Sequence, residues 1–149
     1  MIEIVKTDAT NKDFIELVKE LDAYLTITDG DEHDFYDQYN KLDEIKYVLV
    51  AYHNGRAVGC GALKQFSANK MEIKRMYTVA QQRGQGIASL ILANLEKQAK
   101  ELGFDNCILE TGLRQHEAIH LYKKNNYQII PNYGQYIGVE NSLCFWKKI

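Results

Sequence analysis

A glycine loop between a strand-like and a helix-like segment constrains this chain more than any other feature. Residues 81–88 read Gln-Gln-Arg-Gly-Gln-Gly-Ile-Ala, so Gly84 and Gly86 come directly before a helical pattern. Glycine has no Cβ, which lets the backbone approach a ligand closely. The first N–H groups of a helix have no intrahelical partner and point out of its N-terminus. The loop therefore predicts a site for phosphate or pyrophosphate.

Composition and charge favour one ordinary domain, residues 1–149, in the cytoplasm. The 149 residues are 46% hydrophobic and 26% charged, and the net charge of −2 gives no basic field for a nucleic-acid partner. No apolar run approaches the roughly 18–20 residues of a membrane span, and the N-terminus lacks a signal-peptide pattern, so no membrane partner is expected. Cys60, Cys107 and Cys144 lie in apolar, strand-like segments, which predicts buried free thiols.

The periodicity of apolar residues predicts strands in the first half of the chain and alternating helices and strands in the second. Strands are expected over 1–7, 47–52, 57–65, 70–79, 106–111, 127–130 and 142–148, and helices over 13–25, 87–102 and 115–125, with a second short helix through Tyr39. Thr10 or Asn11 would cap the first helix, and Gly103 would end the helix after the glycine loop. This order indicates an α+β fold with a mixed, mostly antiparallel sheet and helices on both faces.

A dinucleotide site is the first interpretation of the glycine loop. Residues 84–89 give G-x-G-x-x-S, and Glu110 near the end of the next strand would bind a ribose. However, four residues separate the strand from Gly84, whereas the turn of a dinucleotide-binding fold is tighter. Only 63 residues follow Gly86 in a chain of 149, too few for the rest of a doubly wound domain. The sequence does not favour this class.

A zinc hydrolase is the second interpretation, because residues 116–120 read His-Glu-Ala-Ile-His on a predicted helix. Glu140 would be the third ligand. At about 100° per residue, His116 and His120 fall on the same side of the helix as Lys123, opposite the apolar side. The apolar side must face the core, so we expect both histidines in solvent beside lysines. We therefore predict no metal site.

Three segments together resemble a known family. Arg83 places a cation beside the glycines, and residues 81–86 match Q/R-x-x-G-x-G/A, the acetyl-CoA signature of the GNAT superfamily of N-acetyltransferases. Residues 72–77 resemble the central strand of that family, and residues 118–127 resemble its A-x-x-L-Y-x-x-x-G-F/Y helix end. Two positions depart from the pattern: Gln115 stands where the family often has Asn, and Asn126 replaces a glycine. Asn is the next-best residue for a left-handed helix end, so the second change is physically mild.

The resemblance implies a fold, a co-substrate and a set of site residues. It implies a three-layer α/β/α domain with a sheet of six to seven strands, and direct transfer of an acetyl group from acetyl-CoA to an amine in a ternary complex. The thioester carbonyl would lie near the backbone of Met76, Tyr77 and Thr78. The implied pyrophosphate-binding residues are Arg83, Gly84, Gln85, Gly86, Ile87, Ala88 and Ser89, with Gln115 near the pantetheine.

Two side chains carry the implied chemistry. Glu72 has the position of the family's general base, and Tyr122 matches its general acid. Each has a plainer interpretation from the residues alone: Glu72 as a solvated or salt-bridged strand residue, and Tyr122 as a core tyrosine.

The acceptor is less constrained than the donor. Aromatic residues Tyr133 and Tyr136 are candidates for one wall of its site, and an acidic stretch between the first helices is a candidate for the other, comprising Asp29, Asp31, Glu32, Asp34 and Asp37. We expect a small-molecule or peptide amine as acceptor and a monomer or homodimer. The alternative function is a non-catalytic acyl-CoA-binding or regulatory module on the same fold.

Overall fold

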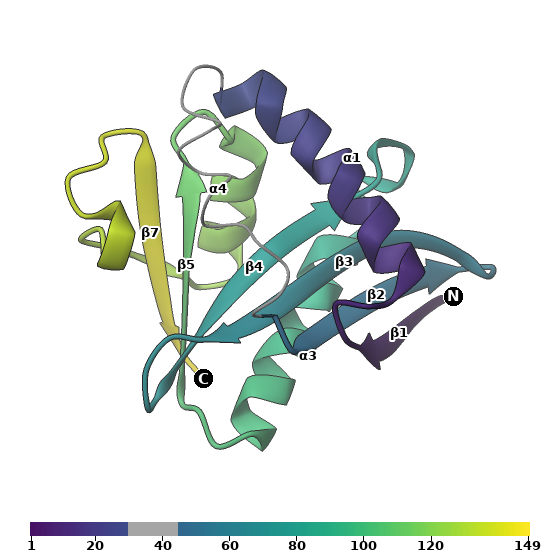
Figure 1. Cartoon of the computed structure of the whole chain (residues 1–149), viewed down its shortest axis with the longest axis horizontal. Coiled ribbons are helices and arrows are strands. Elements are labelled where there is room, and N and C mark those ends of the chain that lie inside the picture. The colour runs from purple at the N-terminus through teal and green to yellow at the C-terminus, as the bar shows by residue number, and fades with distance from the viewer. Residues whose placement is uncertain (30–44) are drawn as a thin grey trace.

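One seven-stranded sheet organises the chain, for which the computed structural model describes residues 1–29 and 45–149 (Figure 1). Its order is β1-β2-β3-β4-β5-β7-β6. The strands are β1 (Ile2–Thr7), β2 (Tyr47–His53), β3 (Arg56–Gln65), β4 (Lys70–Thr78), β5 (Asn106–Gly112), β6 (Gln128–Ile130) and β7 (Ser142–Lys148). Strands β4 and β5 pair in parallel and the other neighbours are antiparallel. The predicted mixed, mostly antiparallel sheet is confirmed, and it differs from the parallel sheet of a dinucleotide-binding fold.

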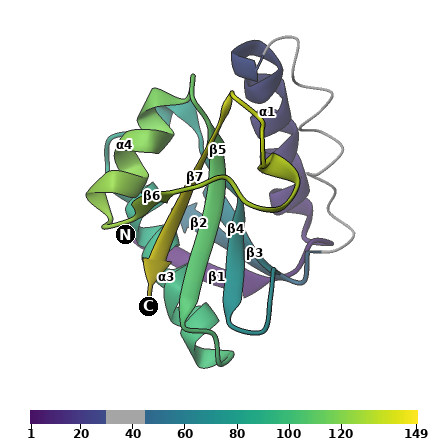
Figure 2. The same ribbon diagram turned by 90° about the vertical axis from the view of Figure 1, so that its left-hand side faces the viewer.

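Helices cover both faces of the sheet, as predicted. Figure 2 shows α1 (Lys12–Asp29) on one side, and α3 (Ile87–Glu101) and α4 (His116–Lys124) on the other. The alternation along β2 explains the layers: Val48 and Val50 pack in the core under α1, whereas Leu49 and Ala51 pack in the core under α3. Two short 3-10 turns, η2 (Ala80–Gln82) and η3 (Gly134–Tyr136), complete the described elements.

The predicted helix ends follow local chemistry. The Asn11 Oδ1 accepts a hydrogen bond from the Phe14 backbone N–H at 3.0 Å, so Asn11 is the cap of α1. This helix runs on to Asp29, beyond the predicted end at residue 25. Gly103 follows α3 in a left-handed conformation, with φ of 95°. The predicted second short helix lies outside the described residues.

Strand β4 has a bulge opposite β3. Cys60 pairs with Tyr77 and Ala62 with Lys74, so two residues of β4, Arg75 and Met76, lie opposite the single residue between them on β3. Arg75 adopts a left-handed conformation with φ of 56°, a costly geometry for a residue with a Cβ, and its buried guanidinium pairs with Asp22 of α1.

Strands β4 and β5 separate before the bulge. Their pairing runs from Lys70 with Asn106 to Glu72 with Ile108 and then stops. Figure 1 shows the two strands diverging towards their arrowheads. Over residues 73–78 the side of β4 that faces β5 has no strand partner among the described residues. Side chains bind two of the carbonyl oxygens of this segment, because Cys60 donates to that of Arg75 and Arg83 to that of Thr78.

The three cysteines are buried free thiols, as predicted, and they make the fold sensitive to alkaline pH. Burial raises the pKa of Cys60 and Cys107 to about 12 and that of Cys144 to about 11, from an ordinary value of 9.0. Because the folded state binds these protons more tightly than the unfolded state, the stabilisation is complete below pH 9 and is lost as pH rises towards 12.

We therefore expect the urea midpoint of unfolding, measured with reductant present, to fall between about pH 8 and about pH 11. Changing Cys60 and Cys107 to alanine should make the midpoint less dependent on pH over this range. An equal midpoint at both pH values in the unaltered chain would contradict this expectation.

No helix among residues 1–29 and 45–149 is long and apolar enough to cross a bilayer.

Candidate functional site

The glycine loop leads directly into the first turn of α3. Gly84 and Gly86 both have φ of 80°, and apart from adjacent backbone no atom of the described residues lies within 4 Å of where a Cβ would stand on either. Gly86 is the N-cap of α3, and no side chain caps this end. The first amide with an intrahelical bond is that of Leu90, which donates to the Gly86 carbonyl oxygen. The amides of residues 87–89 thus point from the helix end without an intrahelical partner, in the way expected of an anion site.

A groove of about 280 Å³ runs from this loop between β4 and α4. It is lined by Leu21 and Tyr24 of α1, by the end of β4, by the glycine loop with the start of α3, and by one side of α4. The predicted residues that it brings together are Met76, Tyr77, Thr78, Arg83, Gly84, Gly86, Ile87, Ala88, Ser89, Gln115 and Tyr122. Gln85 does not line the groove, and this residue is exposed between the two glycines.

Arg83 lies at the mouth of the groove and is held there on several sides. Its Nε donates a hydrogen bond to the Thr78 carbonyl oxygen at 3.0 Å, and its guanidinium lies 5.4 Å from the ring centre of Tyr24 and 5.7 Å from that of Tyr77. The Glu117 carboxylate is 3.8 Å away and largely exposed, so solvent weakens that attraction. The stacked guanidinium is a fixed positive charge close to the loop.

The hydrogen bonds at the C-terminus of α4 hold Tyr122 at the inner end of the groove. The amides of Asn126 and Tyr127 donate to the carbonyl oxygens of Lys123 and Tyr122, and Asn126 has φ of 71°. This is the left-handed helix ending that the sequence predicted for Asn126. The ring of Tyr127 then packs against that of Tyr122, with 5.9 Å between centres.

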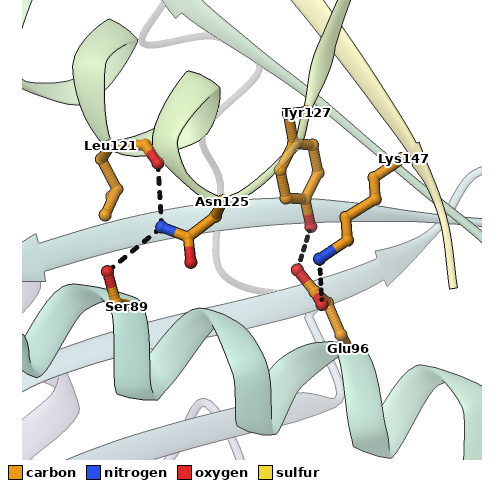
Figure 3. Close-up of polar contacts among 6 residues, drawn as sticks. All are labelled: Ser89, Glu96, Leu121, Asn125, Tyr127 and Lys147. Carbon is orange, nitrogen blue, oxygen red and sulfur yellow. Dashed lines mark hydrogen bonds and ion pairs between the residues drawn. The ribbon is translucent and has the colours of Figure 1, made fainter.

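Polar contacts hold α4 against α3 (Figure 3). The Asn125 Nδ2 donates to the Ser89 Oγ at 3.1 Å and to the Leu121 carbonyl oxygen at 2.9 Å. Further along α3, the Glu96 carboxylate accepts a hydrogen bond from the Tyr127 hydroxyl at 2.8 Å. The same carboxylate forms an ion pair with Lys147 of β7 at 2.9 Å. The Asn125 contact with Ser89 joins the end of α4, which carries Tyr122, to the start of α3. The Glu96 contacts lie outside the groove and join α3 to Tyr127 and β7.

The hydroxyl of Tyr122 carries a proton at neutral pH. Burial, with a smaller contribution from the Glu110 carboxylate, raises its pKa well above the ordinary value of 10.0. Among the described residues no hydrogen bond holds this hydroxyl, although the tyrosine is only 6% exposed. Such a group is a proton donor without a hydrogen-bond partner in the described part of the chain.

A smaller chamber of about 100 Å³ adjoins the groove in the opening between β4 and β5. Leu21, Met76, Gln115, Ala118 and Tyr122 line both cavities, so the chamber and the groove meet at Tyr122. Glu72 does not line the groove but lies in the chamber, together with Lys74, Arg75, Glu110, Thr111 and Tyr136.

Both carboxylates of the chamber accept hydrogen bonds, and that of Glu72 is buried. Glu72 is 5% exposed, and its Oε2 accepts a hydrogen bond from the Tyr133 hydroxyl at 2.7 Å. Its Oε1 lies 3.9 Å from the Lys74 Nζ, and burial lowers the pKa of that lysine. Glu110 of β5 accepts a hydrogen bond from the Ser142 hydroxyl at 2.7 Å. Glu72 is therefore not a solvated strand residue.

Several of these contacts were not predicted from the sequence. Tyr133 was expected only as an acceptor wall, and Glu110 only as a ribose ligand of the dinucleotide interpretation. The contact of Tyr133 with Glu72 and the place of Glu110 in the chamber depend on the opening between β4 and β5, for which the sequence carried no signal. The acidic stretch expected as another wall falls outside the described side chains, so its place is not described.

The histidines of the zinc interpretation lie apart from both cavities. His116 and His120 are exposed on α4, as the helical wheel predicted, and Glu140 is exposed in the loop before β7. Among residues 1–29 and 45–149, no three histidine, cysteine, aspartate or glutamate side chains come together as metal ligands.

Comparison with known proteins places this geometry in a family. The model of the acetyltransferase (GNAT) family matches residues 14–127. IAA acetyltransferase of Azospirillum brasilense is 31% identical over 124 residues, which cover 82% of this chain and 81% of that protein. Aminoalkylphosphonate N-acetyltransferase of Salmonella typhimurium is 30% identical over 127 residues, covering 82% and 79%.

Solved structures agree with the fold. A crystal structure of a candidate acyl-CoA N-acyltransferase from Klebsiella pneumoniae is 32% identical and superimposes with a TM-score of 0.84, covering 99% of this chain and 97% of that one. The PaiA N-acetyltransferase of Thermoplasma acidophilum, solved in complex with coenzyme A, has a TM-score of 0.74 at 20% identity and covers 100% and 99% of the two chains.

Proposed function

The chain belongs to the GNAT family of acetyltransferases, and from this premise we propose how its two cavities divide the work of acetyl transfer. The protein is an acetyl-CoA-dependent N-acetyltransferase. The groove takes acetyl-CoA and the chamber takes the amine. One observation supports this division above all. The uncapped start of α3 and the buried Tyr122 both line the groove, and Tyr122 also lines the chamber that contains Glu72.

The residues of the loop fit a pyrophosphate. An anion gains from the amides of residues 87–89 and from the positive end of α3. Gly84 and Gly86 leave open the space that side chains would fill. Arg83 adds a fixed positive charge at the mouth, and Gln115 lies along the groove where the pantetheine would pass.

The unpaired backbone of β4 fits the thioester. Acetyl-CoA supplies an activated acetyl group when it is bound. Beyond Glu72, residues 76–78 have no strand partner among the described strands on the side that faces β5. Backbone N–H groups at this edge would stabilise negative charge that develops on the carbonyl oxygen, as in other acyl transfers.

Glu72 and Tyr122 fit the two proton transfers. An amine of ordinary pKa near 10.4 is neutral in only about one molecule in a thousand at neutral pH, so a base must take its proton. Glu72 would accept this proton, directly or through water, from its place in the chamber. Tyr122, where the cavities meet, would give its proton to the thiolate that leaves.

The acceptor is an amine, and we assign it to small-molecule or peptide primary amines. The two named relatives differ in this respect, since one is an aminoalkylphosphonate N-acetyltransferase and the other an IAA acetyltransferase. Residues 1–149 would act as one domain in the cytoplasm, as a monomer or homodimer. A non-catalytic acyl-CoA-binding module is less well supported. Binding alone does not require a buried carboxylate in the chamber or a tyrosine hydroxyl where the two cavities meet.

A thermal-shift comparison of acetyl-CoA, NADH and zinc tests the donor assignment. Acetyl-CoA at about 100 times its Kd should raise the Tm by roughly 5–10 °C, because it binds only the folded state. NADH and zinc should leave the Tm unchanged. Stabilisation by NADH or zinc but not by acetyl-CoA would overturn the assignment.

A further inference from the structure

The hydroxyl of Tyr133 reaches Glu72 from a distant part of the chain. Tyr133 lies in the loop between β6 and β7, and its hydroxyl donates to the Glu72 Oε2 at 2.7 Å. Burial, together with the Glu72 carboxylate, raises the pKa of Tyr133 well above its ordinary value, so this hydroxyl remains a donor at neutral pH. A hydrogen bond from a neutral donor to a buried carboxylate is stronger than one between neutral groups.

The loop that carries Tyr133 is itself fixed. The ring of Tyr133 packs edge-on against Phe66 at 5.0 Å and against Tyr136 at 5.8 Å between centres. The neighbouring Asn132 Nδ2 donates to the carbonyl oxygens of Val139 and Ser142, at 3.0 and 3.1 Å, which ties the two ends of the loop together. The Tyr133 hydroxyl is therefore held in one place before a substrate arrives.

The two oxygens of Glu72 have different surroundings. Oε2 has the short bond to Tyr133, whereas Oε1 lies 3.9 Å from the Lys74 Nζ, beyond hydrogen-bond range. Without the tyrosine hydroxyl, the carboxylate could rotate towards Lys74 and shorten the ion pair that the two side chains form. Such a rotation would move the oxygen that has to face the amine.

We propose that Tyr133 is a positioning residue that orients the Glu72 carboxylate for proton abstraction from the amine. The proposal rests on the role of Glu72 as base. Tyr133 binds one oxygen of the carboxylate and leaves the other for the substrate, and it exchanges no proton in the reaction. A displacement of about 1 Å at a catalytic group can cost up to a hundredfold in rate, so the effect of this bond is measurable.

A double-mutant cycle tests the proposal. Tyr133→Phe removes only the hydroxyl and should lower kcat about tenfold, with the KM for acetyl-CoA unchanged within about twofold. In the Glu72→Gln background the same change should have no further effect, because Tyr133 acts through the carboxylate. A matched control is Tyr127→Phe, which removes a hydroxyl bonded to Glu96 outside both cavities and should leave kcat unchanged.

Two outcomes would overturn the proposal. One is an unchanged kcat in Tyr133→Phe, and the other is an equal tenfold loss in the wild-type and Glu72→Gln backgrounds. An unchanged kcat in Glu72→Gln would remove the base on which the proposal rests, and would overturn it as well. Failure of the proposed function would look different, since the unaltered enzyme would then release no thiol with any amine.

Discussion

Replacing Tyr122 with phenylalanine should lower kcat about a hundredfold and leave the affinity for acetyl-CoA nearly unchanged. The hydroxyl lies where the groove meets the chamber, it carries a proton at neutral pH, and no described residue holds it. A positioned proton donor contributes about 10²–10⁴-fold to a rate. The ring remains in Tyr122→Phe, so the packing against Tyr127 and Phe145 is kept.

The stability of Tyr122→Phe distinguishes a loss of catalysis from a loss of folding. Removing a hydroxyl that has no hydrogen-bond partner among residues 1–29 and 45–149 costs little, since no bonded group there is left unsatisfied. We therefore expect Tyr122→Phe to lose kcat while its Tm stays unchanged. The affinity for acetyl-CoA, measured by calorimetry, should also stay nearly unchanged. Tyr127→Phe should show the reverse, a small loss of Tm and full activity, because its hydroxyl is bonded to Glu96. An unchanged kcat in Tyr122→Phe would leave Tyr122 as a core tyrosine.

Replacing Gly86 with alanine should weaken acetyl-CoA binding about thirtyfold or more. The added methyl group would enter the space in front of the uncapped start of α3, where no protein atom lies within 4 Å. It would displace an anion from the backbone amides, and hydrogen bonds to charged groups contribute about 1.5–3 kcal/mol each. A loss of about 2 kcal/mol corresponds to about thirtyfold in Kd.

The chain offers a matched control at the other end of α3. Gly103 is also left-handed, with φ of 95°, and has no atom within 4 Å of an added Cβ. Alanine at either position should cost about 1–2 kcal/mol of stability, since both residues would keep a positive φ. Only Gly86→Ala should raise the Kd for acetyl-CoA. Equal Kd values in the two variants would show that the loop is not where acetyl-CoA binds.

Features that depend on neighbouring residues could be predicted from the sequence. The glycines before α3, the left-handed Asn126 after α4 and the outward histidines of α4 each follow from local dihedral preference or from the 3.6-residue period. The fold class could be predicted as well, because the order of strands and helices along the chain limits how helices can cover the sheet.

Features that depend on register between distant segments could not be predicted. The bulge at Arg75 follows from pairing with β3, and nothing in the residues 72–77 marks a left-handed arginine. The bond from Tyr133 to Glu72 joins positions 61 residues apart, and it exists only because β5 and β7 stand beside the opening of the sheet. Glu72 and Tyr122 could be found as candidates, but not the cavities in which they lie.

Release of free thiol from acetyl-CoA, measured with and without an added amine, tests the central claim most directly. The panel should contain small primary amines and lysine-containing peptides, and the acetylated product should be identified by mass. We predict thiol release that requires an amine, in amounts equal to the acetylated amine formed. Tight binding of acetyl-CoA with no amine-dependent thiol release across the panel would contradict the claim and would indicate a non-catalytic acyl-CoA-binding module.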